Sequence, residues 1–184
     1  MRLEIKGGKK LEKSKHEIKD KTFELAKKYE LEYGNCAQCV FAAVTEALGV
    51  ENKDVFRAAT GFADGVGLTG DGHCGALSGG TMAISYLFGR QKDEFHRRGK
   101  MMKALLLSRQ LHDRFIEKYG ACRCYDLQTK FFGRFFNLLD QDEMMAAVQA
   151  GLPEVCSTLT GNIARMTVEL IFEQQEKDTA KGNA

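Results

Sequence analysis

The sequence predicts an all-α protein, and three observations support this prediction. Pro153 is the only proline among the 184 residues, so long helices can run without interruption. Apolar residues recur at helical spacing along most of the chain, and alternating runs rich in Val, Ile and Thr are scarce. We therefore expect a single-domain, irregular bundle of about six helices, with a glycine-rich loop lying across helix N-termini.

The composition narrows the classes of function. A hydrophobic content of 43% and a charged content of 28% are typical of globular proteins, and a net charge of +2 predicts no nucleic-acid partner. We see no secretory signal and no run of about 18 apolar residues, so we expect no membrane association and a cytoplasmic location. In the reducing cytosol, six cysteines are more typical of metal ligands or redox thiols than of structural disulfides.

Local signals divide the chain into elements. Residues 1–13 are polar and basic and predict a flexible tail, residues 14–177 form the helical domain, and residues 178–184 form a polar tail. Ser14 and Glu17 have the pattern of a capping box, and Gly34 is a stop signal for that first helix. Asn35, Asn52 and Asp140 are natural N-caps. The expected helices are then about 14–33, 36–48, 54–60, 74–88, 91–119, 141–149 and a last one from Pro153 to the polar tail.

A glycine-rich stretch interrupts this pattern between Gly61 and Gly80, where eight of twenty residues are glycine. Glycine permits sharp turns and close approach of another group, and here it surrounds Cys74. A phosphate-binding loop is disfavoured, because the motif GxxxxGK[ST] is absent and no predicted strand precedes the stretch. The loop is therefore expected to serve the thiol of Cys74.

The cysteines are the candidate functional residues. Cys36 and Cys39 form a CxxC pair in the first turn of a predicted helix, where free N–H groups and the helix dipole favour thiolate over thiol. Cys74 and Cys156 are also expected near helix starts. The candidate catalytic thiols are Cys36, Cys39 and Cys74, and the candidate cofactor contacts beside Cys74 are Gly72, His73 and Gly75. The candidate metal ligands are Cys36, Cys39, Cys74, Cys122, Cys124 and Cys156.

The order of these cysteines resembles the redox-active family named after its own motif, C_GCAxxG_C_C. The first cysteine corresponds to Cys36, the third to Cys124 and the fourth to Cys156, and the central motif reads HCGALSG over residues 73–79. This chain departs from the motif in that a histidine precedes and a glycine follows the central cysteine, and Cys39 and Cys122 are additional. The resemblance covers about residues 30–170 and implies a small helical protein with thiol or cluster chemistry.

Related sequence also occurs in split-Soret-type cytochromes, in which an iron–sulfur centre accompanies haem. Residue 40 is Val, so the haem-attachment motif CxxCH is absent here and no covalent haem is expected.

Three functions from different classes fit these observations. In the first, four thiolates hold an iron–sulfur cluster that exchanges electrons with an unidentified redox partner. In the second, Cys36 with Cys39 or Cys74 cycles between dithiol and disulfide. In the third, the cysteines hold a structural zinc ion in a binding module. Buried, unreactive cysteines are a fourth interpretation, disfavoured by their positions in loops and at helix starts.

A run of phenylalanines, Phe131, Phe132, Phe135 and Phe136, predicts either core packing or a homodimer surface.

Overall fold

The computed structural model describes residues 8–182, and within that range the chain is all-α with no β-strand. The element order confirms the predicted class, although the helices are more numerous than the six expected. Their bounds are α1 Gly8–Tyr33, α2 Cys36–Leu48, α3 Lys53–Ala58, α4 Gly75–Phe88, α5 Met102–Tyr119, α6 Cys124–Phe132, α7 Gln141–Gln149 and α8 Leu152–Gly182, with short 3₁₀ helices η1 Ala59–Phe62 and η2 Arg98–Met101.

The first and last helices are longer than expected. Helix α1 begins at Gly8 rather than Ser14, because the Lys-, Leu- and Glu-rich residues 9–13 favour helix and no residue there interrupts it. Helix α8 continues beyond residue 177 to Gly182. The remaining parts of the predicted tails, residues 1–7 and 183–184, lie outside the described residues.

Three helix starts follow from local capping as expected. The side chains of Asn35, Asn52 and Asp140 each accept hydrogen bonds from backbone amides two or three residues further along the chain. These bonds satisfy amides that have no partner within the helix, so they fix the starts of α2, α3 and α7.

The expected helix over residues 91–119 is wrong in its first third, because α5 begins only at Met102. The guanidinium of Arg90 donates a 2.6 Å hydrogen bond to the carbonyl of Phe95 and lies 4.5 Å from the centre of that ring. These contacts hold residues 90–95 as a turn, and η2 follows before the long helix.

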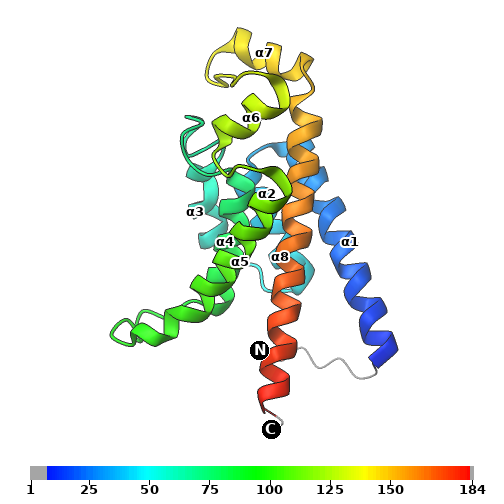
Figure 1. Cartoon of the computed structure of the whole chain (residues 1–184), viewed down its shortest axis with the longest axis vertical. Helices are drawn as coiled ribbons and strands as arrows, with labels where there is room; N and C mark the ends of the chain where they lie inside the picture. The colour runs from blue at the N-terminus through cyan, green and yellow to red at the C-terminus, as the bar shows by residue number, and fades with distance from the viewer. Residues whose placement is uncertain (1–7, 183–184) are drawn as a thin grey trace.

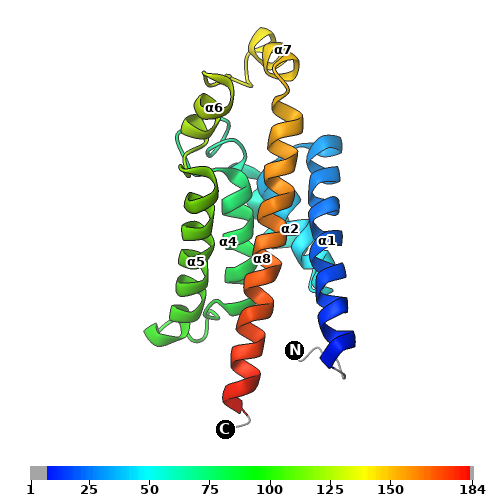
Figure 2. The same cartoon turned by 45° about the vertical axis from the view of Figure 1, so that its right-hand side comes forward.

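Helices α1, α2, α4, α5 and α8 pack along the long axis of the molecule, while α6 and α7 lie at one end (Figures 1 and 2). Helix α8 contacts α1, α2, α4 and α5. The core includes the fully buried side chains Val40, Phe41, Val44, Ile84, Leu111, Phe115, Ile163, Val168, Leu170 and Ile171.

Helices α2 and α4 approach each other closely near their N-terminal ends. A Cβ atom at Gly79 would lie 2.3 Å from the carbonyl oxygen of Ala37, so only glycine permits this spacing. The small residues at the start of α4 therefore allow the tight packing expected from the sequence. They also bring the first turns of the two helices, with Cys36 and Cys74, side by side.

The phenylalanine run packs mainly within the chain. The ring of Phe132 lies edge-on to both Phe131 and Phe136, and the ring of Phe135 stacks on Tyr125. Phe136 is buried and the other three are partly buried. The core-packing interpretation accounts for these contacts, and the homodimer stays a prediction.

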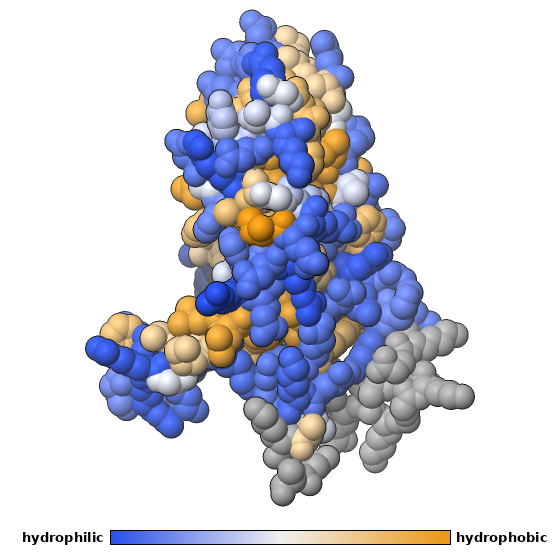
Figure 3. Space-filling view, in the orientation of Figure 1, coloured by the Kyte–Doolittle hydropathy of each residue, from blue (hydrophilic) through white to orange (hydrophobic). Residues whose placement is uncertain are grey.

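The most apolar part of the face in Figure 3 covers the first turns of α5 and the segment that leads into them. Exposed apolar side chains there include Phe95, Met102, Leu105 and Leu106. Among residues 8–182, no helix combines the length and the apolar character that crossing a membrane requires.

Candidate functional site

Four cysteines meet where several helices begin, and we call Cys36, Cys74, Cys124 and Cys156 the thiol cluster. Cys36 is the first residue of α2, Cys74 immediately precedes α4, and Cys124 is the first residue of α6. Cys156 follows the start of α8 at Leu152 by four residues. Cys74 interacts electrostatically with each of the other three thiols, and Cys36 also interacts with Cys124 and Cys156. These are the four positions that the family motif indicated.

Close approach between α2 and the start of α4 depends on Gly75. A Cβ atom at this position would lie 2.4 Å from Sγ of Cys36 and 2.7 Å from the carbonyl oxygen of Phe62. Any side chain would therefore push the thiol of Cys36 away from Cys74. Gly75 was predicted as a cofactor contact; its observed role is to leave room for a thiol.

The glycine-rich loop between η1 and Cys74 folds back on itself. Amide-to-carbonyl bonds of 2.9 Å join Gly67 to Gly61 and Gly70 to Asp64. A Cβ atom at Gly65 would lie 2.6 Å from the backbone of Gly70, so the two turns touch through backbone atoms. The loop thus packs tightly beside the thiol cluster and carries Asp64 into it.

Asp64 is a functional candidate that sequence reasoning missed. Its Oδ1 accepts hydrogen bonds from Sγ of Cys124 at 2.9 Å and from Nε2 of Gln128 at 2.7 Å, whereas its Oδ2 is buried without a partner. Burial raises the pKa of Asp64, although these two bonds oppose the rise. Its φ of 45° lies in the left-handed region, which Asp tolerates better than most residues. The glycine-rich stretch contains two acidic residues, Asp64 and Asp71, and nothing in the sequence distinguished Asp64 as the one beside the thiols.

Glu30, in the last turn of α1, is the second missed carboxyl group. Burial raises its pKa from 4.5 to about 7, an effect that the neighbouring thiol of Cys39 only partly offsets. Its Oε2 is buried without a hydrogen-bond partner. Glu30 also interacts electrostatically with Cys36, Cys74 and Cys156. Its sequence context gave no signal, since charged residues are common on an exposed helix face.

The thiols of the cluster have raised pKa values, contrary to the expectation from their positions at helix starts. Burial is the largest cause for all four, and it raises the pKa of Cys74 to about 11. The amides of Ala76 and Leu77 at the start of α4 offset part of the rise at Cys74. Desolvation and the neighbouring acidic groups therefore outweigh the helix dipole.

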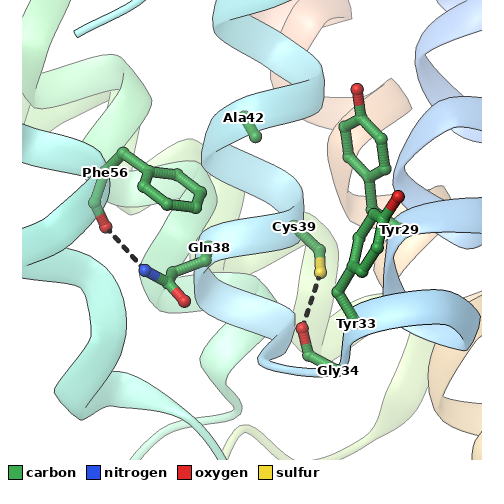
Figure 4. Close-up of a pocket in the computed structure, with 7 residues that line it drawn as sticks. All are labelled: Tyr29, Tyr33, Gly34, Gln38, Cys39, Ala42 and Phe56. Atoms are coloured by element: carbon green, nitrogen blue, oxygen red, sulfur yellow. Dashed lines mark hydrogen bonds between the residues drawn. The ribbon is translucent and has the colours of Figure 1, made fainter. Parts of the chain in front are cut away.

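The two thiols of the CxxC pair, Cys36 and Cys39, lie in different surroundings. Sγ of Cys39 donates a 3.0 Å hydrogen bond to the carbonyl of Gly34 and lies beside Tyr29 and Tyr33, as Figure 4 shows. Burial and Glu30 raise the pKa of Cys39, whereas Cys36 interacts with the other thiols of the cluster. Cys39 therefore faces a separate pocket.

Backbone hydrogen bonds join the glycine-rich loop to the start of α6, in the region of Gly72, His73 and Cys122. The amide of Cys74 donates to the carbonyl of Cys122 at 2.7 Å, and the amide of Cys124 donates to the carbonyl of Gly72 at 3.0 Å. A third bond, 2.9 Å long, runs from the amide of Tyr125 to the carbonyl of Gly70. We call these three bonds the backbone clip. They hold Cys74 and Cys124 next to each other.

His73 lies within the clip but its side chain is on the surface. Its backbone forms an isolated antiparallel bridge with Arg123, and its exposed ring lies 6.2 Å from the ring of His112, between centroids. The predicted roles of Gly72 and His73 as cofactor contacts stay predictions, while their observed role is to position the cysteines.

The side chains at this site have the chemistry of ligands for a thiolate-bound metal centre, but their arrangement fits such a centre only in part. The four thiols interact with two carboxyl groups, Asp64 and Glu30, that each have one buried oxygen without a partner, and together these groups form a strongly acidic set of possible ligands and hydrogen-bond acceptors. Among residues 8–182, however, no three Cys, His, Asp or Glu side chains are arranged to hold a metal ion. Metal binding would therefore require the thiols to rotate towards one another.

Comparison with known proteins gives one match. The family model described as "Putative redox-active protein (C_GCAxxG_C_C)" matches residues 34–170, which include all six cysteines and the glycine-rich loop. No curated protein and no solved structure matches the chain.

Proposed function

Because the chain belongs to the C_GCAxxG_C_C family of redox-active proteins, we propose that the thiol cluster holds an iron–sulfur centre and that the protein carries electrons. The proposed ligands are Cys36, Cys74, Cys124 and Cys156. Such a centre supplies a site that gains and loses single electrons without a change in the protein's covalent structure.

One observation carries this proposal: six acidic groups, each buried or half-buried, interact with one another, namely the four thiols, Asp64 and Glu30. The groups that raise the pKa values of the thiols are other thiols and carboxyl groups, and only backbone amides lower them. Ionised groups of like charge are costly to bury unless a positive charge joins them. A cationic metal centre supplies that charge, and thiols that bind a metal lose their protons.

The surrounding backbone suits thiolate ligands. The amide of Asp64 lowers the pKa of Cys36, and the amides of Ala76 and Leu77 lower that of Cys74. Amides that favour thiolate in this way donate N–H···S hydrogen bonds, which tune the reduction potential of a thiolate-bound centre. The glycine-rich loop and the start of α4 would thus set the potential.

The alternatives receive less support from the geometry. A nucleophilic thiol requires a lowered pKa and access to solvent, yet Cys39 and Cys74 are buried and their pKa values are raised. Zinc draws four ligands close around one ion, whereas a cluster of several iron atoms is larger and leaves its ligands further apart. Because no three Cys, His, Asp or Glu side chains among residues 8–182 are arranged to hold a single ion, a larger centre is the better match to the thiols.

The test compares two cysteines that are two residues apart. The full chain, purified without oxygen, should show broad visible absorbance and contain iron and acid-labile sulfide in near-equal amounts. Cys124→Ser should lose both, whereas Cys122→Ser, whose thiol lies outside the thiol cluster, should keep them. A colourless protein with stoichiometric zinc, or one without metal, would refute the proposal, and equal iron in the two variants would refute the ligand set.

A further inference from the structure

A pocket of about 370 Å³ lies beside the thiol cluster, between α1, α2 and α3. Its floor is Cys39 and Ala42 on α2, and Figure 4 shows Phe56 on one side and Tyr29 and Tyr33 on the other. Gln38 lies between the floor and Phe56. The volume falls within the range of small-molecule sites, so the pocket can hold a compact organic ligand.

The aromatic walls are more exposed than such side chains usually are. Tyr33 is 74% exposed and Phe56 is 41% exposed, although both lie next to well-packed helices. The rings of Tyr29 and Tyr33 lie 5.9 Å apart, between centroids, and are inclined at 43°. A flat ring placed over Cys39 and Ala42 would cover these aromatic faces, which prefer offset-stacked or edge-to-face contacts.

The polar groups of the pocket are already fixed by the protein. Nε2 of Gln38 donates to the carbonyl of Phe56 at 3.1 Å and to the hydroxyl of Thr60 at 2.9 Å. The hydroxyl of Tyr29 donates to a carboxylate oxygen of Glu46 at 2.7 Å. Because these side chains are held in place, a ligand would meet a preformed site and cost little conformational entropy.

The charges around the pocket select against anions. Glu46 is bonded to Tyr29, and Glu30 lies next to Cys39. Arg57 on α3 is exposed and lies 3.6 Å from Asp54, which offsets its charge. A phosphate or carboxylate group on a ligand would meet the carboxylate of Glu46 here, so an uncharged ligand fits better.

We propose that this pocket binds a flat, uncharged, multi-ring aromatic molecule, such as a quinone or an isoalloxazine. The ligand would lie over Cys39, which is one helical turn, an axial rise of about 4.5 Å, from Cys36. It would thus sit next to the thiol cluster. The proposal concerns binding alone, and it holds whether or not the thiols carry a metal.

The test titrates the full chain with two probes, lumiflavin followed by its fluorescence and 2,3-dimethyl-1,4-naphthoquinone, which has no free quinone ring position for thiol addition, as a competitor. We expect saturable binding that weakens about tenfold or more in Tyr33→Ala and Phe56→Ala, because each loses one stacking face. Phe62→Ala is the matched control, since Phe62 is exposed to a similar degree but lies outside the pocket. Circular dichroism of each variant verifies the fold.

The two probes distinguish which type of ring the pocket binds. Binding of only lumiflavin supports an isoalloxazine, and binding of only the naphthoquinone, measured directly by dialysis, supports a quinone. Absence of saturable binding for both probes, or equal affinities in Tyr33→Ala, Phe56→Ala and Phe62→Ala, would overturn the proposal. Cys36→Ser should keep wild-type affinity for the probes, so a failed metal site and a failed pocket give different results.

Discussion

Sγ of Cys124 donates a 2.9 Å hydrogen bond to Oδ1 of Asp64, a residue sixty positions earlier in the chain. The same oxygen accepts from Nε2 of Gln128, which lies one turn further along α6. A single carboxyl group therefore ties the glycine-rich loop to the helix that carries the third cysteine of the thiol cluster.

Replacement of Asp64 should destabilise the fold. Asp64→Ala leaves Nε2 of Gln128 with only a long 3.7 Å contact to Sγ of Cys124 and places alanine at a positive φ, so we expect a loss of about 2 kcal/mol in the free energy of unfolding. Asp64→Asn keeps an acceptor oxygen and tolerates that backbone conformation, so its loss should be smaller. Urea denaturation of the metal-free protein measures both. The control Asp93→Ala, at an exposed position, should change stability by less than about 0.5 kcal/mol, and an equal effect at the two sites would contradict the assigned role.

Gly75→Ala should also be costly, because its Cβ would meet Sγ of Cys36 at 2.4 Å and the backbone of Phe62 at 2.7 Å. Relief requires α2 or η1 to shift, and overpacking of this kind costs about 1–3 kcal/mol. Gly99→Ala is the matched control, since no atom lies within 4 Å of its Cβ position and its φ is not positive. Thermal melts should show a lower Tm for Gly75→Ala alone. Equal melting temperatures would mean that the close approach is not required.

Glu30 should make the stability of the metal-free protein depend on pH. Its pKa is raised from 4.5 to about 7 in the fold, so the folded state binds more protons than the unfolded state between these values. Stability should therefore fall as the pH rises from 4.5 to about 7, by up to about 3 kcal/mol. Asp64, whose pKa is also raised, adds a slope of the same sign.

If Glu30 causes this dependence of stability on pH, Glu30→Gln should remove the larger part of it. Denaturant unfolding of the wild type and the variant at several pH values between 4 and 8 gives the two slopes. Glu24→Gln, at an exposed position on the same helix, should leave the wild-type slope unchanged. A Glu30→Gln protein with the full wild-type slope would rule out Glu30 as its source.

The features that could be predicted are those that depend on residues close together in the sequence. Asn35 and Asp140 marked the starts of α2 and α7 because a capping side chain acts within three residues. Helix α6 was missed because Arg123 at its start makes no side-chain capping bond, and the phenylalanine run that follows indicated only packing. The turn near Arg90 was missed because one arginine–carbonyl bond there replaces a helical turn.

The sequence predicted the cysteines of the candidate site but not its carboxyl groups. The sequence named all six cysteines as candidate ligands and left open which of them share a site. The family resemblance marked Cys36, Cys74, Cys124 and Cys156, and these are the thiols that interact with one another in the structure. Asp64 and Glu30 became visible only in three dimensions, because their effect depends on burial beside thiols from distant segments. The same burial reversed the expected direction of the thiol pKa values, since desolvation is a property of the packed fold and not of a helix start.

The backbone clip has a consequence for folding kinetics. Its three hydrogen bonds join residues 70–74 to residues 122–125, so they can form only after about fifty intervening residues have closed into a loop. Contacts between such distant segments tend to form late during folding and to open in local fluctuations that leave the rest of the bundle intact. Amide hydrogen exchange at Cys74, Cys124 and Tyr125 would therefore report directly how often the two halves of the site come apart.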